Sequence, residues 1–133
     1  MKEMPKIQKV MTTMPHTIGS DIPISKALSM MREHNIRHLP VQQGGELVGI
    51  LSDRDLKLAT SFSGPDELKV EDVMMPDPYV ADPAAPLDQV VARMAERKLG
   101  CTIIKQTNGK VVGILTDNDA LRVLAEVLRE NYK

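Results

Sequence analysis

Two seven-residue segments with almost the same sequence limit what this chain can fold into more than any other feature. Residues 49–55 read GILSDRD, and residues 113–119 read GILTDND. The offset is 64 residues (113 − 49), close to half of the 133-residue length. An internal repeat of this spacing predicts two similar structural units, either within one compact domain or as two small domains that share a core.

The repeat continues upstream of this motif with an offset of 63 residues, which aligns Pro23 with Pro86 and Met31 with Met94. In each copy a proline-containing lead-in precedes apolar residues at helical spacing, and two short apolar segments joined by a glycine-bearing turn follow. The order predicted for each copy is strand–helix–strand–strand–helix. The predicted segments are lead-ins at 14–18 and 75–80, strands at 38–41, 47–51, 102–104 and 111–115, closing helices at 53–60 and 117–130, and a turn-rich hinge at 61–66.

Composition excludes several classes of protein. The formal net charge is −1 and aromatic residues make up 2% of the chain, which argues against a nucleic-acid-binding surface. The single cysteine cannot form an intrachain disulfide, which favours a reducing compartment. The sequence has no apolar run of membrane-spanning length and no secretory signal near its start, so we expect a cytoplasmic location and no membrane partner.

The last predicted helix carries a wide apolar stripe for so small a core. Its members are Ala120, Leu121, Val123, Leu124, Val127 and Leu128. Part of this stripe would face a second copy of the chain, or all of it would pack within its own chain; the sequence leaves both readings open.

The chain resembles a CBS-domain pair, also called a Bateman module. The resemblance lies in the lead-ins, the IRHLPV segment at 36–41, the glycine turns and the doubled closing motif. The resemblance implies an α/β (α+β) fold of two tandem β-α-β-β-α units packed about a pseudo-twofold axis. It places the first CBS unit at 7–61, a linker at 62–69 and the second unit at 70–130. Members of this family typically sense adenosine-containing ligands in the cleft between the units, and two pairs commonly form a disc-like dimer.

The doubled motif has a chemistry that suits a nucleotide. Ser52 and Thr116 fall where a strand gives way to a helix, and free amide groups and the helix dipole favour phosphate oxygens there. Asp55 and Asp119, three residues later, can accept hydrogen bonds from both ribose hydroxyls. The resemblance accordingly implies phosphate contacts for the two hydroxyls and ribose contacts for the two carboxylates. The same Ser/Thr-x-x-Asp pattern is also a helix capping box that needs no ligand, and one residue can serve both purposes.

Further ligand-binding residues follow from the family positions that would form an apolar slot for adenine. They are Ile22, Ile36, Arg37, His38 and Pro40 in the first copy, and Ala85, Leu99, Gly100, Cys101 and Ile103 in the second. The two copies are unequal inside the motif, because Arg54 can meet phosphate charge where the second copy has Asn118. Asp53 and Asp117 place negative charge beside the expected phosphate position, which would favour Mg²⁺-bridged phosphates, a monophosphate or an uncharged tail.

We expect no catalytic residues and no resident metal. His34 and His38 have helical metal-ligand spacing, but Pro40 makes a continuous helix through His38 unfavourable. Cys101 lies in an apolar segment that predicts a buried, inert thiol, and no phosphate-binding loop or nucleophile elbow is present.

The expected function is therefore that of a regulatory module, not an enzyme. It would bind AMP, ADP, ATP or S-adenosylmethionine between its units and signal to a partner protein. One alternative is a ligand-free interaction scaffold whose motif residues serve only as helix caps, and a weaker one is nucleic-acid binding.

Overall fold

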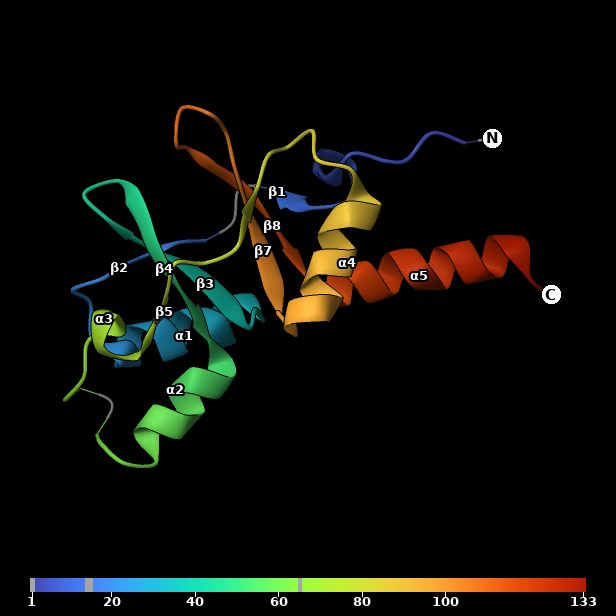
Figure 1. Ribbon diagram of the computed structural model, residues 1–133. Coiled ribbons are helices and arrows are strands. Elements are labelled where there is room, and N and C mark those ends of the chain that lie inside the picture. The colour runs from blue at the N-terminus through green and yellow to red at the C-terminus, as the bar shows by residue number, and fades with distance from the viewer. Residues whose placement is uncertain (1, 14–15, 65) are drawn as a thin grey trace. The chain divides into compact units, whose positions relative to one another are not determined.

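The computed structural model describes residues 2–13, 16–64 and 66–133, and the fold is shown in Figure 1. Met14 and Pro15 of the first expected lead-in, and Pro65 of the expected hinge and linker, lie outside the described residues. Over the ranges described, the chain forms two four-stranded sheets and five α-helices. The predicted mixed class of helices and strands in two similar units is confirmed.

The chain divides into two compact units that do not coincide with the two halves of the sequence. The continuous unit is Pro15–Pro78, and the composite unit combines Met1–Met14 with Tyr79–Lys133. Each unit holds one of the four-stranded sheets together with its own helices. The segment before Pro15, which includes the start of the first repeat, therefore belongs to the unit that contains the second motif.

The continuous unit has its strands in the order β2-β3-β4-β5. The β2 strand runs parallel to β3, with α1 as the crossover between them, and the other neighbours are antiparallel. The elements are β2 (Ile18–Gly19), α1 (Ile24–His34), β3 (His38–Gln43), β4 (Glu46–Ser52), α2 (Asp53–Thr60), α3 (Val70–Val73) and β5 (Met75–Pro76).

Local sequence explains where these elements begin and end. Pro23 is the extended N-cap of α1, and Asn35 ends that helix in the left-handed conformation with φ 53°. The β3–β4 hairpin turns at Gly44 and Gly45, whose φ angles of 59° and 82° are easily adopted only without a side chain. The second helix, α2, has the predicted bounds 53–60.

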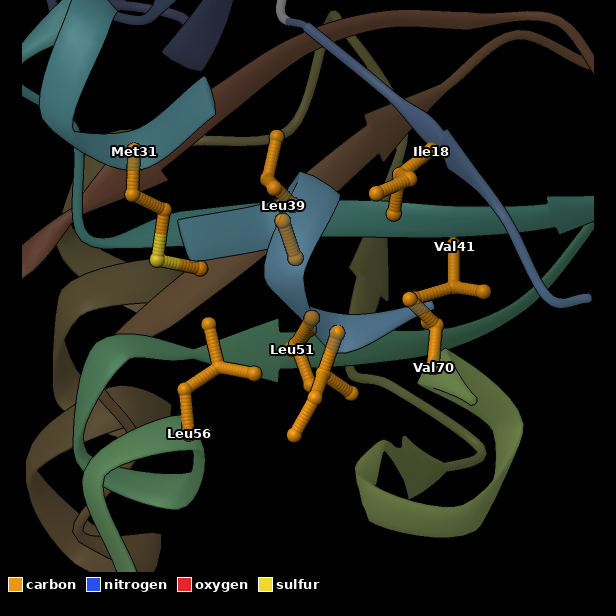
Figure 2. Close-up of a cluster of buried hydrophobic side chains, with 9 residues drawn as sticks. Ile18, Met31, Leu39, Val41, Leu51, Leu56 and Val70 are labelled. Carbon is orange, nitrogen blue, oxygen red and sulfur yellow. The ribbon is translucent and has the colours of Figure 1, made fainter. Parts of the chain in front are cut away.

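One face of this sheet forms the core of the continuous unit (Figure 2). Helices α1 and α2 supply apolar side chains that pack against alternate strand residues. The buried members are Ile18, Ile24, Ala27, Met31, Leu39, Val41, Leu51, Leu56 and Val70. Because strand residues alternate between faces, Leu39 and Val41 point into this core and Pro40 lies on the opposite face.

The composite unit repeats this design with the strand order β1-β8-β7-β6. Its elements are η1 (Ile7–Lys9, a 3-10 turn), β1 (Thr12–Thr13), β6 (Val80–Ala81), α4 (Leu87–Arg97), β7 (Cys101–Lys105), β8 (Val111–Thr116) and α5 (Asp117–Asn131). Its core contains Ile7, Leu87, Val90, Met94, Ile104 and Leu115. Thr102 is fully buried, and its hydroxyl has no hydrogen-bond partner among the described residues, whereas the equivalent position of the continuous unit holds Leu39.

The edge strands show how the sequence halves exchange segments. In β1, Thr12 pairs with Ile114 of β8, and in β5, Met75 pairs with Ile50 of β4. The second lead-in is thus divided, because β5 completes the continuous unit and β6 begins the composite one. Each closing strand needs an antiparallel neighbour, and the segment that supplies it comes from the other side of the repeat boundary.

The α5 helix leaves much of its apolar stripe uncovered. Leu121, Leu124, Val127 and Leu128 are between 46% and 63% exposed. No helix in the described ranges combines the length and the apolar character that a membrane crossing requires.

Candidate functional site

The first motif lies at the junction of β4 and α2 in the continuous unit. Ser52 is the helix N-cap, and its hydroxyl accepts a hydrogen bond of 3.1 Å from the amide of Asp55. The amide of Asp53 donates to the carbonyl of Arg37 at 2.9 Å. The amide of Arg54, which lies between Asp53 and Asp55, has no acceptor among the residues the structure describes. The helix start therefore keeps one amide available for an anion.

The Asp55 side chain does not complete a capping box. It is half-buried, and within the described part of the chain its carboxylate forms no hydrogen bond or ion pair. The neighbouring Asp53 carboxylate lies 3.7 Å from the ammonium of Lys57 on the same helix, while the Arg54 side chain is exposed. The carboxylate that the sequence predicts as a ribose acceptor is thus available to accept hydrogen bonds.

The second motif, at the junction of β8 and α5, has a different arrangement. Thr116 is the N-cap, and its hydroxyl accepts from the Asp119 amide at 3.2 Å, as at the first motif. Here Asp119 also accepts from the Thr116 amide at 2.9 Å, which completes the capping box. The Asn118 amide, which corresponds to that of Arg54, donates to the Asp117 carboxylate at 2.8 Å.

The structure brings several predicted slot residues next to their motif. In register, His38 of β3 pairs with Ser52, and Cys101 of β7 pairs with Thr116. Just before these strands, the carbonyls of Arg37 and Gly100 accept hydrogen bonds from the amides of the first helical residues of α2 and α5. Each motif and the residues that lead into the preceding strand therefore lie at one end of their sheet.

The other predicted slot residues near each motif differ in burial. Ile36 and Leu99 are half-buried and pack against the cores of their own units, whereas the Arg37 side chain is exposed. Pro40 and Ile103, two residues into their strands, are buried and lie on the sheet face opposite the core. Most of the residues predicted to line the adenine therefore lie on the sheet face opposite the core or at the end of the sheet near the motif.

Ile22 and Ala85 are not brought next to the motif of their own unit. Each follows the short parallel strand, β2 or β6, at the far end of the sheet from Ser52 or Thr116. Their carbonyls accept hydrogen bonds from Val70 and Ile7, respectively, and both side chains pack against the unit core.

The glycine at the start of each motif accommodates a methionine of the neighbouring segment. A Cβ atom at Gly49 would lie 2.6 Å from the Met74 sulfur and 2.9 Å from the Met75 carbonyl oxygen. The Met11 side chain occupies the equivalent position over Gly113. The close approach that glycine permits here is thus made by the protein itself.

Cys101 has the character that its apolar setting predicts. Burial, and to a smaller degree the charge of Asp117, raises the pKa of its thiol from 9.0 to about 12. A thiol that stays neutral in this way is a poor nucleophile. Over the described ranges, no three histidine, cysteine or carboxylate side chains gather as metal ligands would.

Two residues beside the second motif were not predicted. Thr12 donates to the Asp119 carboxylate at 3.4 Å, and Arg122 lies 3.3 Å from its other oxygen. The spacing of Asp119 and Arg122, three residues apart on a helix, is a recognisable sequence signal. Thr12 gives no such signal, because it lies 107 residues away in the chain.

The structure is a tandem repeat of two α+β units, each with a Ser/Thr-x-x-Asp motif where its last strand meets its last helix. The chain belongs to the CBS domain family, whose model matches residues 7–61 and 70–126. It is 32% identical over 118 residues to the CBS domain-containing protein YhcV of Bacillus subtilis (strain 168), covering 87% of this chain and 83% of that one.

Solved structures of CBS-domain proteins match nearly the whole chain. The CBS domain pair of protein MJ0100, in complex with 5-methylthioadenosine and S-adenosyl-L-methionine, is 26% identical with a TM-score of 0.86 over 93% of this chain and 98% of that one. CBSX2 in complex with AMP is 26% identical with a TM-score of 0.77 over 92% and 97%. The chain also matches longer enzymes, of which it spans 23% in one case and 21% in another.

Proposed function

We propose that this chain is a regulatory module that binds an adenosine-containing ligand between its two CBS units. The observation that carries the proposal is the open carboxylate of Asp55 in a fold whose solved relatives hold AMP, 5-methylthioadenosine and S-adenosyl-L-methionine. A carboxylate without internal partners is well suited to accept hydrogen bonds from the two hydroxyls of a ribose.

The surroundings of Asp55 fit the rest of such a ligand. The Arg54 amide and the exposed side chains of Arg54 and Arg37 would meet phosphate groups. Ile36, His38 and Pro40 would line the adenine. The Asp53 carboxylate would repel a triphosphate unless Mg²⁺ bridged the two. A monophosphate or the cationic tail of S-adenosylmethionine therefore fits better than free ATP.

Signalling would pass to a partner protein through a change in the balance of conformations. A ligand that contacts both units favours the arrangement that it binds best, and a partner can distinguish that arrangement from the others. We propose that the module acts in the cytoplasm, where adenosine nucleotides are abundant and a single cysteine stays reduced.

A homodimer is part of this proposal, with α5 as the contact. Its exposed leucines recur at 121, 124 and 128, a spacing that places them on one side of the helix. A second copy of the same helix is a matching apolar surface.

Thermal unfolding tests the ligand assignment. At one hundred times its dissociation constant a ligand adds about 2.7 kcal/mol to the free energy of unfolding, which raises the melting temperature by several degrees. We expect such a rise with AMP, ADP, ATP, S-adenosylmethionine or 5-methylthioadenosine, each measured with and without Mg²⁺. Asp55→Asn should abolish it, and the exposed Asp88→Asn on α4 is the matched control.

A melting temperature that none of these compounds raises would leave the ligand-free scaffold as the better function. A binding assay with single-stranded RNA at low salt covers the nucleic-acid alternative, for which we expect no retention.

A further inference from the structure

We propose that the second motif is a structural clamp and that the chain binds one ligand, at Asp55, rather than two. This proposal rests on the proposed function for its ligand and on the contacts of Asp119 for its choice of site. It assigns Asp119 to holding the N-terminal strand β1 against the start of α5.

The oxygen atoms of Asp119 are already engaged. One of them accepts from the Thr116 amide at 2.9 Å, from the Thr116 hydroxyl at 3.1 Å and, in the longest contact, from the Thr12 hydroxyl at 3.4 Å. The other lies 3.3 Å from the guanidinium of Arg122. The residue is only 3% exposed, so a ribose could reach this carboxylate only by displacing protein donors.

The equivalent positions of the continuous unit explain why Asp55 differs. Thr12 pairs with Ile114, and the residue that pairs with the corresponding Ile50 is Met75. The repeat offset of 64 places Leu58 where α5 has Arg122. Thr12 and Arg122, which contact Asp119 in addition to its capping box, thus correspond to Met75 and Leu58. These apolar side chains have no donor for the Asp55 carboxylate.

The backbone amides at the starts of α2 and α5 also favour the first motif as the ligand site. The Asn118 amide donates to the side chain of Asp117 at 2.8 Å, whereas the corresponding Arg54 amide has no acceptor in the described ranges. The second motif thus lacks both the free carboxylate and the free amide that the first motif offers. Its exposed cation is also missing, because Asn118 stands in the place of Arg54.

The clamp has a structural purpose. Asp119 connects β1, through Thr12, to the part of the composite unit that lies 107 residues further along the chain. A buried carboxylate that joins two distant segments stabilises their association. We therefore expect loss of Asp119 to affect folding stability and loss of Asp55 to affect binding.

Isothermal titration of the 133-residue chain with AMP, and separately with 5-methylthioadenosine, tests the assignment. The expected result is one ligand per chain. Asp55→Asn should weaken binding at least tenfold, whereas Asp119→Asn should keep the stoichiometry and change the dissociation constant less than twofold. The same Asp119→Asn should lower the melting temperature by about 4 °C or more without ligand. Two ligands per chain, or a lower stoichiometry in Asp119→Asn, would overturn the proposal.

Should Asp119→Asn fail to fold, Thr12→Val and Arg122→Leu, which copy the apolar character of the first unit, provide a second test. Each should lower the melting temperature while the ligand count stays at one. If no adenosine compound binds the native chain, the proposed function fails, and the clamp is then judged by a double-mutant cycle of Thr12→Val and Asp119→Asn. Melting-temperature shifts that simply add would show that the two residues do not interact.

Discussion

Cys101 illustrates how burial alone can keep a cysteine unreactive. It pairs in register with Thr116, and burial keeps its thiol protonated with a pKa of about 12. A neutral sulfur is soft and apolar, so it contributes packing rather than charge. Because of this burial, the free energy of unfolding changes with pH in the alkaline range.

The direction of that dependence follows from the two states of the thiol. In the unfolded chain the thiol titrates near its ordinary value of 9.0, and in the folded chain only near 12. Between these values the unfolded state loses the proton first and is favoured, so the stabilisation is complete below pH 9 and decreases as the pH rises toward 12. We expect the free energy of unfolding in urea to fall more steeply from pH 8 to pH 10.5 in the native protein than in Cys101→Ala.

Tyrosine and lysine titrate in the same range, and the comparison with Cys101→Ala subtracts their effect because both proteins share them. Equal slopes in the two proteins would contradict the burial of the thiol. An independent check is alkylation at pH 8 by iodoacetamide, which should be slow until the protein is unfolded.

Residue identity alone could not separate the two motif carboxylates. Ser52-to-Asp55 and Thr116-to-Asp119 have the same spacing, and both were equally open to a capping and a ligand interpretation. Only Asp119 completes the capping box, and one of its additional donors comes from a strand 107 residues away. A contact of that sequence separation depends on strand pairing, which no local pattern specifies.

At the scale of elements, the two equivalent helices α1 and α4 end in the same way with different residues. Asn35 and Lys98 both adopt the left-handed conformation, with φ 53° and 56°. The α4 helix ends at Arg97, three residues before Gly100, so its C-cap is Lys98 and not a glycine. Asparagine tolerates the left-handed region, whereas a lysine there carries a steric penalty.

Lys98→Gly should therefore stabilise the protein. Removal of the Cβ atom relieves the left-handed strain, and we expect the free energy of unfolding in urea to rise by about 1 kcal/mol. The matched variant Asn35→Gly should gain only a few tenths of a kcal/mol, since asparagine already suits this backbone. A loss of stability in Lys98→Gly would mean that the lysine side chain makes a stabilising contact there.

Most long elements could be predicted because they carry their own periodic signal. The α2 helix matches the predicted bounds, and α5 extends one residue further than predicted. The two-residue strands β1 and β5 could not be assigned to a sheet, because so short a segment contains no alternation of its own. Their pairing is decided by which edge, β8 or β4, is left without a neighbour.

At the scale of the whole molecule, the proposed dimer depends on the uncovered stripe of α5. Leu121→Glu combined with Leu128→Glu should convert the dimer into a monomer, because two buried charges would face two others across the contact. Light scattering after gel filtration should give about 29 kDa for the native protein (twice 14.7 kDa) and half of that for the variant.

Glu126→Lys, on the same helix but outside the leucine positions, is the control and should leave the mass unchanged. A native protein that elutes at the mass of one chain would refute the α5 contact. The stripe itself is visible in the sequence, but its exposure depends on packing, so the sequence alone does not choose between a second copy and the same chain. The exposed leucines favour the second copy, and the mass measurement decides.

The position of residues 2–13 has a practical consequence for work with this protein. The β1 strand covers the outer edge of β8, and Met11 lies over Gly113, so this segment contributes to the composite sheet. Trimming it would uncover a bare β edge, the kind of surface through which polypeptides stick together. Equally, neither sequence half contains all of its own sheet, so cutting the gene at the middle of the repeat would yield two incomplete fragments instead of two independent modules.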